Sequence, residues 1–122
     1  MHGTRARPGP AASAARALIA LAERLSPFAR YRVEGDSMSP GYRPGDRLLI
    51  NRLAFVVRGP RPGEVVVVRD PECPDRLLLK RVVRVEGDRC EVLGDNAAAS
   101  RDSRHFGPVS RSAIVGKAAL RY

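Results

Sequence analysis

The amino-acid sequence predicts a mainly β domain of short strands and long loops, preceded by a short amphipathic helix. Apolar segments of strand length alternate with Gly- and Pro-rich turns from residue 31 onward. Only one segment, near the N-terminus, has apolar residues at helical spacing. Aromatic residues make up 5% of the 122 residues and Trp is absent, so aliphatic side chains must fill the core. A chain of this length forms one domain with a short extension.

The N-terminal extension consists of a tail and a helix. Residues 1–10 are rich in Gly, Pro and Arg, which is typical of a flexible tail. Residues 11–26 are alanine-rich, and Leu18, Leu21 and Leu25 recur there at helical spacing. We therefore expect an amphipathic helix over 11–26 that packs on the domain, with weak membrane-surface contact as the alternative.

The β domain is expected to cover residues 31–122. Its strands are predicted at residues 31–34, 46–52, 64–69, 76–86, 89–93 and 113–122. A rigid Pro-Gly loop fills 59–63, and a second loop is expected at 71–75. The turn Gly87-Asp88 makes a hairpin of the two strands around it, and residues 94–108 are expected to be irregular.

The charge of the chain is strongly positive, with a formal net charge of +9 and a pI of about 10.9. Such a charge suits nucleic acid, acidic lipid or an acidic partner. The arginines, however, are scattered along the chain, no segment is typical of a basic recognition helix, and aromatics for base stacking are few. We expect no specific nucleic-acid partner.

The cysteines and histidines predict neither a metal site nor a cofactor. Cys73 and Cys90 form no C-x-x-C motif, and no histidine lies near them at metal-binding spacing. Both are expected to be free thiols. The two histidines, His2 and His105, are not placed for a catalytic triad with a carboxylate.

The longest apolar run near the N-terminus is too short to cross a bilayer. It covers residues 17–22 between Arg16 and Glu23, whereas a spanning helix needs about 20 apolar residues. Glu23 and Arg24 follow the run where a signal peptide would have small residues for cleavage. These features predict a soluble, cytoplasmic protein without a transmembrane anchor.

Ser37 and Lys80 are the candidate catalytic pair. Ser37 lies in the turn-like segment Gly-Asp-Ser-Met-Ser-Pro, and Lys80 lies in the apolar segment Leu-Leu-Leu-Lys-Arg-Val-Val. A serine hydroxyl becomes a good nucleophile only when a nearby base takes its proton. A lysine amine can be that base when burial disfavours its charged form and lowers its pKa. Taken alone, Lys80 is better explained as an ordinary half-exposed residue of a strand with its amine in water.

The use of basic residues favours the catalytic interpretation. Of the 22 Lys and Arg residues only Lys80 and Lys117 are lysines. Arginine stays protonated in proteins and cannot serve as a general base. Lys80 is therefore a basic side chain that can become neutral, and it lies in the most apolar segment of the chain.

A third segment, from Gly94 to Pro108, is dense in polar residues. Asp95, Asp102 and Arg104 could form a hydrogen-bonded network that fixes this loop if the loop is buried. A solvated surface loop is the other interpretation of the same residues.

Taken together and in this order, these motifs resemble the type I signal peptidase family of serine proteases. The matching segments are Gly35-Asp36-Ser37-Met38 with Pro40, Arg43-Pro44-Gly45-Asp46, Arg61-Pro62-Gly63-Glu64, Leu79-Lys80-Arg81-Val82-Val83, and Gly94-Asp95-Asn96 with Ser100, Asp102-Ser103-Arg104 and Gly107-Pro108-Val109. The resemblance runs from about residue 33 to residue 120, and it implies a signal-peptidase-like β domain over 31–122.

The resemblance also implies roles for individual residues. Ser37 matches the nucleophile, Lys80 the general base, and Ser100 a serine that orients the lysine amine. Asp95 and Arg104, with Asp102 beside them, match a structural ion-pair network of the family. Met38 and Pro40 match residues that shape the turn behind the nucleophile.

The sequence departs from some family members at Gly35. Those members have a serine two residues before the nucleophile, and its hydroxyl helps to bind the oxyanion. With glycine at this position, the oxyanion hole depends on backbone N–H groups, chiefly that of Ser37. Glycine also lets a substrate backbone approach closely.

Within the family, a short chain without a membrane anchor is most similar to the nickel-type superoxide dismutase maturation proteases. The implied function is removal of the N-terminal propeptide of that enzyme. Three alternatives stay open: a signal peptidase acting on exported precursors, a LexA-like self-cleaving domain, and a non-catalytic basic nucleic-acid-binding β domain. No Ala-Gly or Cys-Gly bond precedes Ser37, which counts against self-cleavage. Nucleic-acid binding would weaken steeply with salt and would survive Ser37→Ala.

Overall fold

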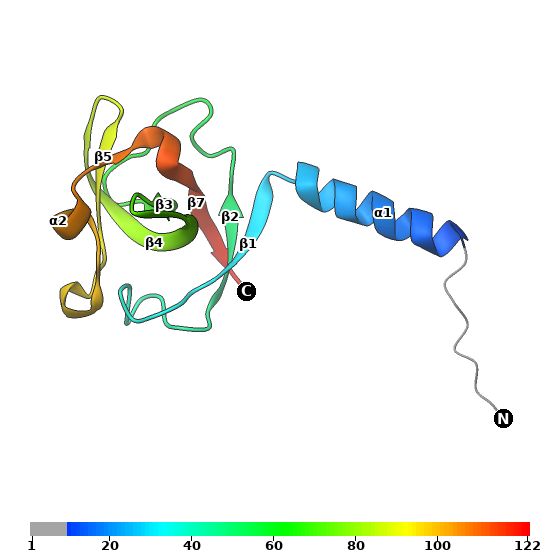
Figure 1. Ribbon diagram of the computed structural model, residues 1–122, viewed down its shortest axis with the longest axis horizontal. Coiled ribbons are helices and arrows are strands. Elements are labelled where there is room, and N and C mark those ends of the chain that lie inside the picture. The colour runs from blue at the N-terminus through cyan, green and yellow to red at the C-terminus, as the bar shows by residue number, and fades with distance from the viewer. Residues whose placement is uncertain (1–9) are drawn as a thin grey trace.

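A computed structural model describes residues 10–122 (Figure 1), so the tail predicted for residues 1–10 lies outside the described residues apart from its last position. The elements in chain order are α1 (Pro10–Leu25), β1 (Phe28–Arg32), β2 (Arg47–Asn51), β3 (Val65–Asp70), β4 (Cys73–Glu86), β5 (Arg89–Leu93), the 3₁₀ turn η1 (Ala97–Ala99), α2 (Ser103–Phe106), β6 (Val109–Ser110), a second 3₁₀ turn η2 (Arg111–Ala113) and β7 (Ile114–Arg121). The predicted mainly β architecture with one short N-terminal helix is confirmed.

The seven strands form one antiparallel sheet in the order β1-β2-β7-β3-β4-β5-β6. The sheet curves strongly, as the ribbon shows (Figure 1). The last strand, β7, inserts between β2 and β3, which places the chain end in the middle of the sheet. A long-range pairing of this kind cannot be read from local sequence patterns.

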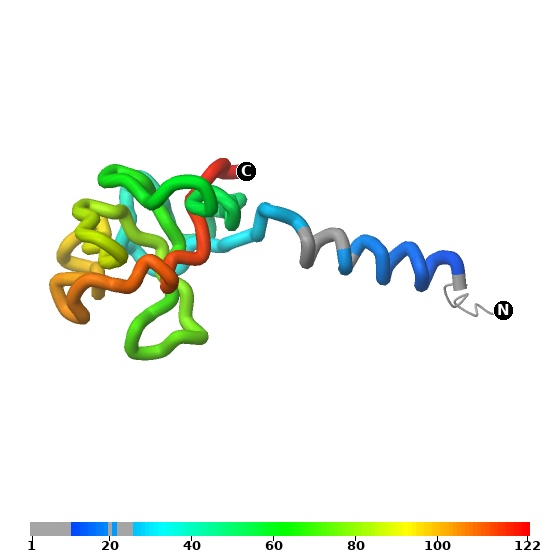
Figure 2. The backbone as a smooth tube through the Cα atoms, turned by 90° about the horizontal axis from the view of Figure 1, so that it is seen from above, coloured from blue at the N-terminus to red at the C-terminus, as the bar shows by residue number. Residues whose placement is uncertain are grey.

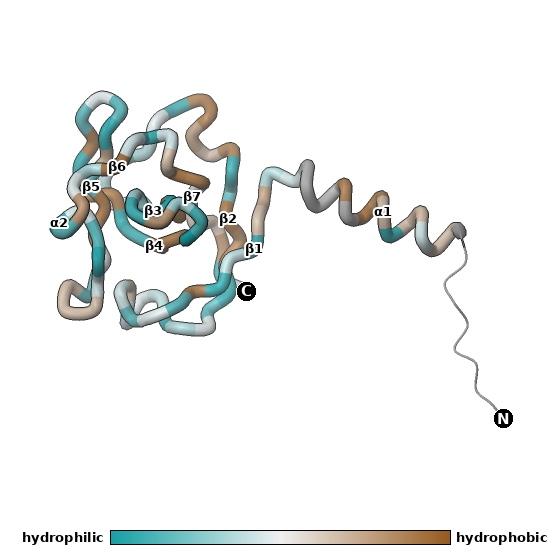
Figure 3. The backbone as a smooth tube through the Cα atoms, in the orientation of Figure 1, coloured by the Kyte–Doolittle hydropathy of each residue, from teal (hydrophilic) through white to brown (hydrophobic). Residues whose placement is uncertain are grey.

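Two clusters of aliphatic side chains form the core. One contains Met38, Leu48, Ile50, Val67 and Leu79, among others. The other gathers Val66, Val68, Val82, Cys90, Val92 and Val109. The run of four valines in β3 is buried at every position, because β3 is central in the sheet and both its faces are covered. Figure 3 shows apolar stretches along the strands of the sheet, and others in α1.

The prediction of a loop over residues 71–75 is wrong for residues 73–75, which belong to β4. β4 begins at Cys73, which pairs with Asp70 across a two-residue turn, so the hairpin between β3 and β4 is tighter than expected. The ladder shifts register between Arg69 and Asp70, and this irregularity accommodates Pro74, which cannot donate to a ladder. Figure 2 shows this hairpin projecting from the body of the domain.

The helix predicted for residues 11–26 is present as α1, but it does not pack on the sheet. It projects away from the domain (Figures 1 and 2), and Leu18, Ile19 and Leu21 are exposed. Within the described residues, no helix has the length and apolar character needed to cross a membrane. Of the two cysteines, both free thiols, Cys73 is exposed and Cys90 is buried in the core.

Glu64, just before β3, ties the 52–63 loop to the sheet. Its carboxylate accepts hydrogen bonds from Arg58 at 2.6 and 2.9 Å and from the N–H of Arg61 at 2.7 Å, and it lies 2.8 Å from Lys117 Nζ. These contacts, chiefly those with Arg58, hold the pKa of the Glu64 carboxyl down at about 2.

We expect Glu64→Gln to lower the free energy of unfolding at pH 7 by about 2 kcal/mol. A carboxyl with a lowered folded-state pKa stabilises the fold above its unfolded pKa of about 4.3, and this contribution is lost as the pH falls through the folded value. The difference in free energy of unfolding between the wild type and Glu64→Gln, measured in urea melts, should therefore decrease between pH 4 and pH 2. Glu86→Gln, at an exposed pair with Arg84, is the control and should change little. An equal deficit of Glu64→Gln at pH 7 and pH 2 would contradict the assignment.

Candidate active site

Ser37 sits in a tight turn that follows β1. Gly35 has φ +70°, a left-handed conformation that favours glycine and lets the chain reverse just before the serine. The N–H of Ser39 donates to the carbonyl of Asp36 at 3.1 Å, closing the turn, and Met38 is 1% exposed in the core. Pro40 follows with a cis Ser39–Pro40 peptide bond. The turn is thus anchored below by Met38 while Ser37 stays half-buried at the surface.

Lys80 occupies the middle of β4, opposite Val66 of β3, and is only 3% exposed. Burial lowers the pKa of its amine from the ordinary value. Asp102 opposes this shift, while the positive charges of Arg104 and Arg76 add to it. The half-exposed alternative for Lys80 is wrong, because the strand places the amine inside the domain.

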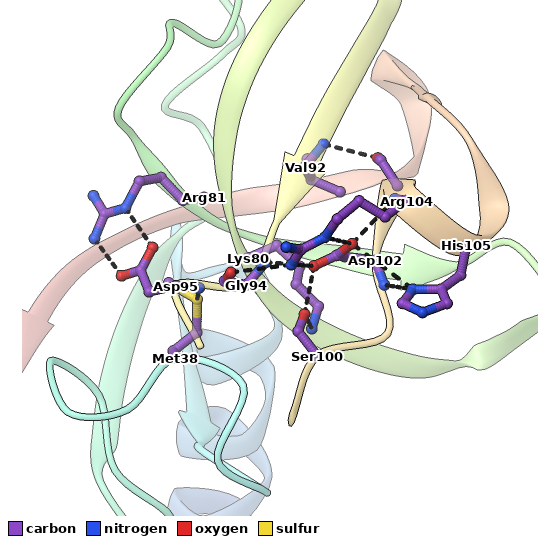
Figure 4. Close-up of polar contacts among 11 residues, drawn as sticks. Met38, Lys80, Arg81, Val92, Gly94, Asp95, Ser100, Asp102, Arg104 and His105 are labelled. Carbon is purple, nitrogen blue, oxygen red and sulfur yellow. Dashed lines mark hydrogen bonds and ion pairs between the residues drawn. The ribbon is translucent and has the colours of Figure 1, made fainter. Parts of the chain in front are cut away.

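A chain of hydrogen bonds leads from Lys80 to Arg104 (Figure 4). Lys80 Nζ donates to Ser100 Oγ at 3.0 Å, and Ser100 Oγ donates to Asp102 Oδ2 at 2.6 Å. Arg104 donates to the same carboxylate from Nε at 3.0 Å and from Nη2 at 2.5 Å, and the N–H of Gly94 donates to it at 2.8 Å. Asp102 also caps the N-terminus of α2.

Asp102 is fully buried and stays charged. Burial alone would raise the pKa of its carboxyl, but the hydrogen bonds from Arg104, Ser100 and the N–H of Gly94 hold that pKa well below its usual range. Because the carboxylate is held by these donors, the Ser100 hydroxyl is directed toward it, and an oxygen lone pair of Ser100 is left to accept from Lys80.

The ion pairs differ from those expected. Arg104 pairs with Asp102, whereas Asp95 pairs with Arg81 through two bonds of 2.9 Å (Figure 4). The Asp95–Arg81 pair is partly exposed at both side chains. The predicted network therefore exists as two separate pairs, one buried behind Lys80 and one at the surface beside it.

The segment 94–104 holds both members of the candidate pair in place. The N–H of Asn96 donates to the carbonyl of Ser37 at 2.8 Å, and the N–H of Asp95 donates to the sulfur of Met38 at 3.4 Å. A side chain at Gly94 would put its Cβ 2.6 Å from Ser100 Cβ and 2.7 Å from the carbonyl oxygen of Ser37. Only glycine allows this approach, which brings the nucleophile turn against the serine that contacts Lys80.

Ser37 and Lys80 line one pocket of about 150 Å³. Its walls are Tyr31, Glu34, Gly35 and Asp36 on the side of the nucleophile turn, residues 76–79 of β4 on the other side, and Ala99 and Arg101 from the third segment. The structure thus brings together Gly35, Ser37 and Lys80 at the pocket, with Ser100 directly behind the amine.

Three residues of this site were not given roles from the sequence. Arg81 follows Lys80 directly on the strand, so its guanidinium leaves the interior and meets Asp95. Asn96 and Gly94 act through close contacts with a turn almost sixty residues earlier in the chain. The Gly-Asp-Asn sequence after a strand indicates a tight turn, but it does not predict that this turn contacts the segment of Ser37.

We expect Ser100→Ala to reduce turnover about tenfold to a hundredfold, because Lys80 loses the hydrogen bond that orients its amine. The fold should change little, because Arg104 and Gly94 still hold Asp102. Steady-state kinetics and thermal melts of the variant measure both effects. Ser103→Ala is the matched control, since the Ser103 hydroxyl accepts from the N–H of Val92 at 2.9 Å and not from Lys80. Unchanged kcat in Ser100→Ala would remove the orienting role.

The sequence matches the family described as "Signal peptidase, peptidase S26" over residues 11–93 and 90–122. Among curated relatives, the chain is 38% identical over 112 residues to the mitochondrial ATP-independent inner membrane protease subunit 1a of Arabidopsis thaliana, which covers 73% of this chain and 67% of that protein. It is 32% identical over 122 residues to the mitochondrial inner membrane protease subunit 2 of Danio rerio, covering 82% of this chain and 66% of the relative.

A bacterial relative extends the similarity. Signal peptidase I of Bacillus caldolyticus is 28% identical over 150 aligned positions, which cover 81% of each chain. The chain spans about two thirds of the length of its mitochondrial relatives. With a family match over almost the whole described structure, and with a serine and a buried lysine at one pocket, this chain belongs to the signal peptidase family S26 of Ser/Lys serine peptidases.

Proposed function

We propose that this chain is a soluble, cytoplasmic endopeptidase that removes the N-terminal propeptide of a nickel-type superoxide dismutase precursor. One observation carries the catalytic part of the proposal: Lys80 is buried, its amine donates to Ser100, and it shares a pocket with Ser37. The family supports a processing protease that acts on a protein substrate. The particular substrate rests on the resemblance of this short chain to the maturation proteases.

The proposed reaction is a two-step acyl transfer. Neutral Lys80 takes the proton of Ser37 Oγ, which attacks the scissile carbonyl carbon and forms a tetrahedral oxyanion. The oxyanion collapses, the peptide C–N bond breaks, and the lysinium gives its proton to the leaving amine. Water, deprotonated by Lys80, then attacks the acyl-enzyme ester, and the proton returns to Ser37 as the new carboxyl product leaves.

A groove for an extended substrate leads away from the pocket. A second hollow of about 520 Å³ shares Tyr31, Glu34, Arg76 and Leu77 with the first, so the two are continuous. β5 pairs with β4 only from Arg81 onward, and this leaves one edge of β4 near Lys80 without a ladder partner in the described part of the chain. A peptide added there as a strand would bring its scissile bond to Ser37.

A second candidate function is cleavage of exported precursors at a membrane surface. Two observations favour it: α1 exposes Leu18, Ile19 and Leu21 to solvent, and the relatives include inner membrane proteases and a signal peptidase. An amphipathic helix with exposed apolar residues and a basic chain is the combination that binds anionic lipid surfaces.

The two functions are separated by one experiment. The purified full chain is incubated with the nickel superoxide dismutase precursor in buffer without detergent or lipid, and the N-terminus of the product is sequenced. We expect a single cut that Ser37→Ala abolishes. An intact dismutase precursor, together with cutting of an export precursor only when anionic lipid vesicles are present, would replace the proposal with the second candidate.

A further inference from the structure

Asn96 lies between the two halves of the site and makes contacts that its position does not require. It is the N-cap of the 3₁₀ turn η1, where an asparagine side chain normally accepts from the backbone of its own helix. Here the side chain makes no capping bond. Its amide nitrogen donates instead to the carbonyl of Asp36, at 3.1 Å.

That carbonyl belongs to the peptide unit whose N–H is the N–H of Ser37. Because a peptide unit is planar, a partner that fixes the carbonyl of Asp36 also fixes the direction of the Ser37 N–H. The N–H of Ser39 donates to the same carbonyl at 3.1 Å. The next peptide unit is fixed too, since the backbone N–H of Asn96 donates to the carbonyl of Ser37 at 2.8 Å.

In this chain the Ser37 N–H is the main candidate donor for stabilising the oxyanion. Position 35 is glycine, so no side-chain hydroxyl is present there to stabilise an oxyanion. A backbone donor contributes to catalysis only when it is already aimed at the oxygen that becomes charged. A hydrogen bond to the carbonyl end of a peptide also polarises its N–H and strengthens it as a donor.

We infer that Asn96 is a positioning residue for the oxyanion hole: its side-chain amide and its backbone N–H clamp the two peptide units on either side of Ser37, so that the Ser37 N–H is held for the developing oxyanion. The inference rests on the proposed peptidase function. It assigns Asn96 a role different from that of Ser100, because Asn96 acts on the nucleophile turn and Ser100 acts on Lys80.

Two variants test this role. Asn96→Ala removes the amide, and Asn96→Asp keeps the size of the side chain but replaces the NH₂ donor by an oxygen that repels the Asp36 carbonyl. Both keep the backbone N–H. We expect kcat to fall roughly tenfold to a hundredfold, less than for loss of a whole oxyanion donor, with KM unchanged. For Asn96→Ala, the pH at which activity rises should stay in place, because that variant adds no charge and leaves Lys80 and its contacts untouched.

Asn51→Ala is the matched control in a chain with two asparagines. The Asn51 side chain also holds a turn, accepting from the N–H of Leu53 at 2.9 Å, but it lies outside the pocket. We expect it to leave kcat unchanged. The assay uses whichever precursor the wild type cuts in the experiment described above, together with thermal melts of all variants.

The outcomes separate this inference from the proposed function. Wild-type cleavage that both Asn96 variants match at full kcat overturns the inference alone. A loss of kcat that follows a lower melting temperature, or a loss in Asn96→Ala that comes with a shifted pH profile, also overturns it, because either result assigns Asn96 a general structural role. A wild type that cuts neither precursor overturns the proposed function and this inference together.

Discussion

Lys80→Arg should abolish cleavage while the domain stays folded. The arginine keeps the positive charge and the hydrogen-bonding capacity of the lysine, but it cannot be neutral and so cannot take the proton of Ser37. We expect the kcat of Lys80→Arg to fall at least about 10³-fold. The kcat of Ser37→Ala should fall by a similar factor, because the two residues act as a unit. Cleavage of the precursor by each variant at saturating substrate is the measurement.

The other lysine of the chain provides the control. Lys117 pairs with Glu64 at 2.8 Å on β7, away from the pocket, and Lys117→Arg should retain activity. Because arginine is larger and position 80 is 3% exposed, Lys80→Met is tested in parallel as an uncharged side chain of similar length. Near wild-type cleavage by either Lys80 variant that is folded would show that another group is the base.

Asp102→Ala should be the most destabilising single change in the site. The variant leaves the buried N–H of Gly94 and the hydroxyl of Ser100 without their acceptor, and each buried orphan costs free energy. We expect the free energy of unfolding to fall by about 3 kcal/mol at pH 7, measured in urea melts. Turnover should fall as well, since Ser100 is no longer directed.

The pH dependence gives this prediction a second test. The pKa of Asp102 is lowered in the folded protein, so its contribution is present above the unfolded value of about 3.9 and is lost as the pH falls. The difference in free energy of unfolding between the wild type and Asp102→Ala should therefore become smaller below about pH 4. Asp95→Ala is the control. Its pair with Arg81 is about one third exposed at both side chains, so the loss should stay below about 1 kcal/mol. Equal losses for the two variants would contradict the distinction between a buried and a surface pair.

The sequence predicts the strands well where local patterns determine them. The hairpin of β4 and β5, the buried β3 and the lysine inside β4 all follow from apolar runs and turn residues. The same patterns cannot show that Cys73 pairs with Asp70, because Pro74 lowers the strand propensity of this segment. Nor can they show that α1 leaves the domain, because its apolar face is equally suited to packing on the domain or binding another surface.

The site was predicted in the same uneven way. The residue types and surroundings of Ser37 and Lys80 predict their chemistry, whereas the role of Ser100 came from the resemblance to the family, and the structure places all three together. The partner of Asp95 depends on the direction of Arg81, which alternates with Lys80 along β4, and the partner of Arg104 is the N-cap residue of α2, Asp102. The contact of Asn96 with the nucleophile turn joins segments sixty residues apart, and a single sequence gives no signal for such a contact.

A titration of the Lys80 amine tests the central claim most directly. With two lysines in the chain, a protein labelled with ¹⁵N at the lysine side chains gives two amine signals, and Lys80→Arg identifies the one from Lys80. We predict that this amine loses its charge at a pH below the ordinary lysine pKa of about 10.4, because it is buried, and that cleavage rises over the same pH range. A Lys80 amine that stays protonated throughout the pH range in which the enzyme cuts would contradict the Ser37–Lys80 mechanism.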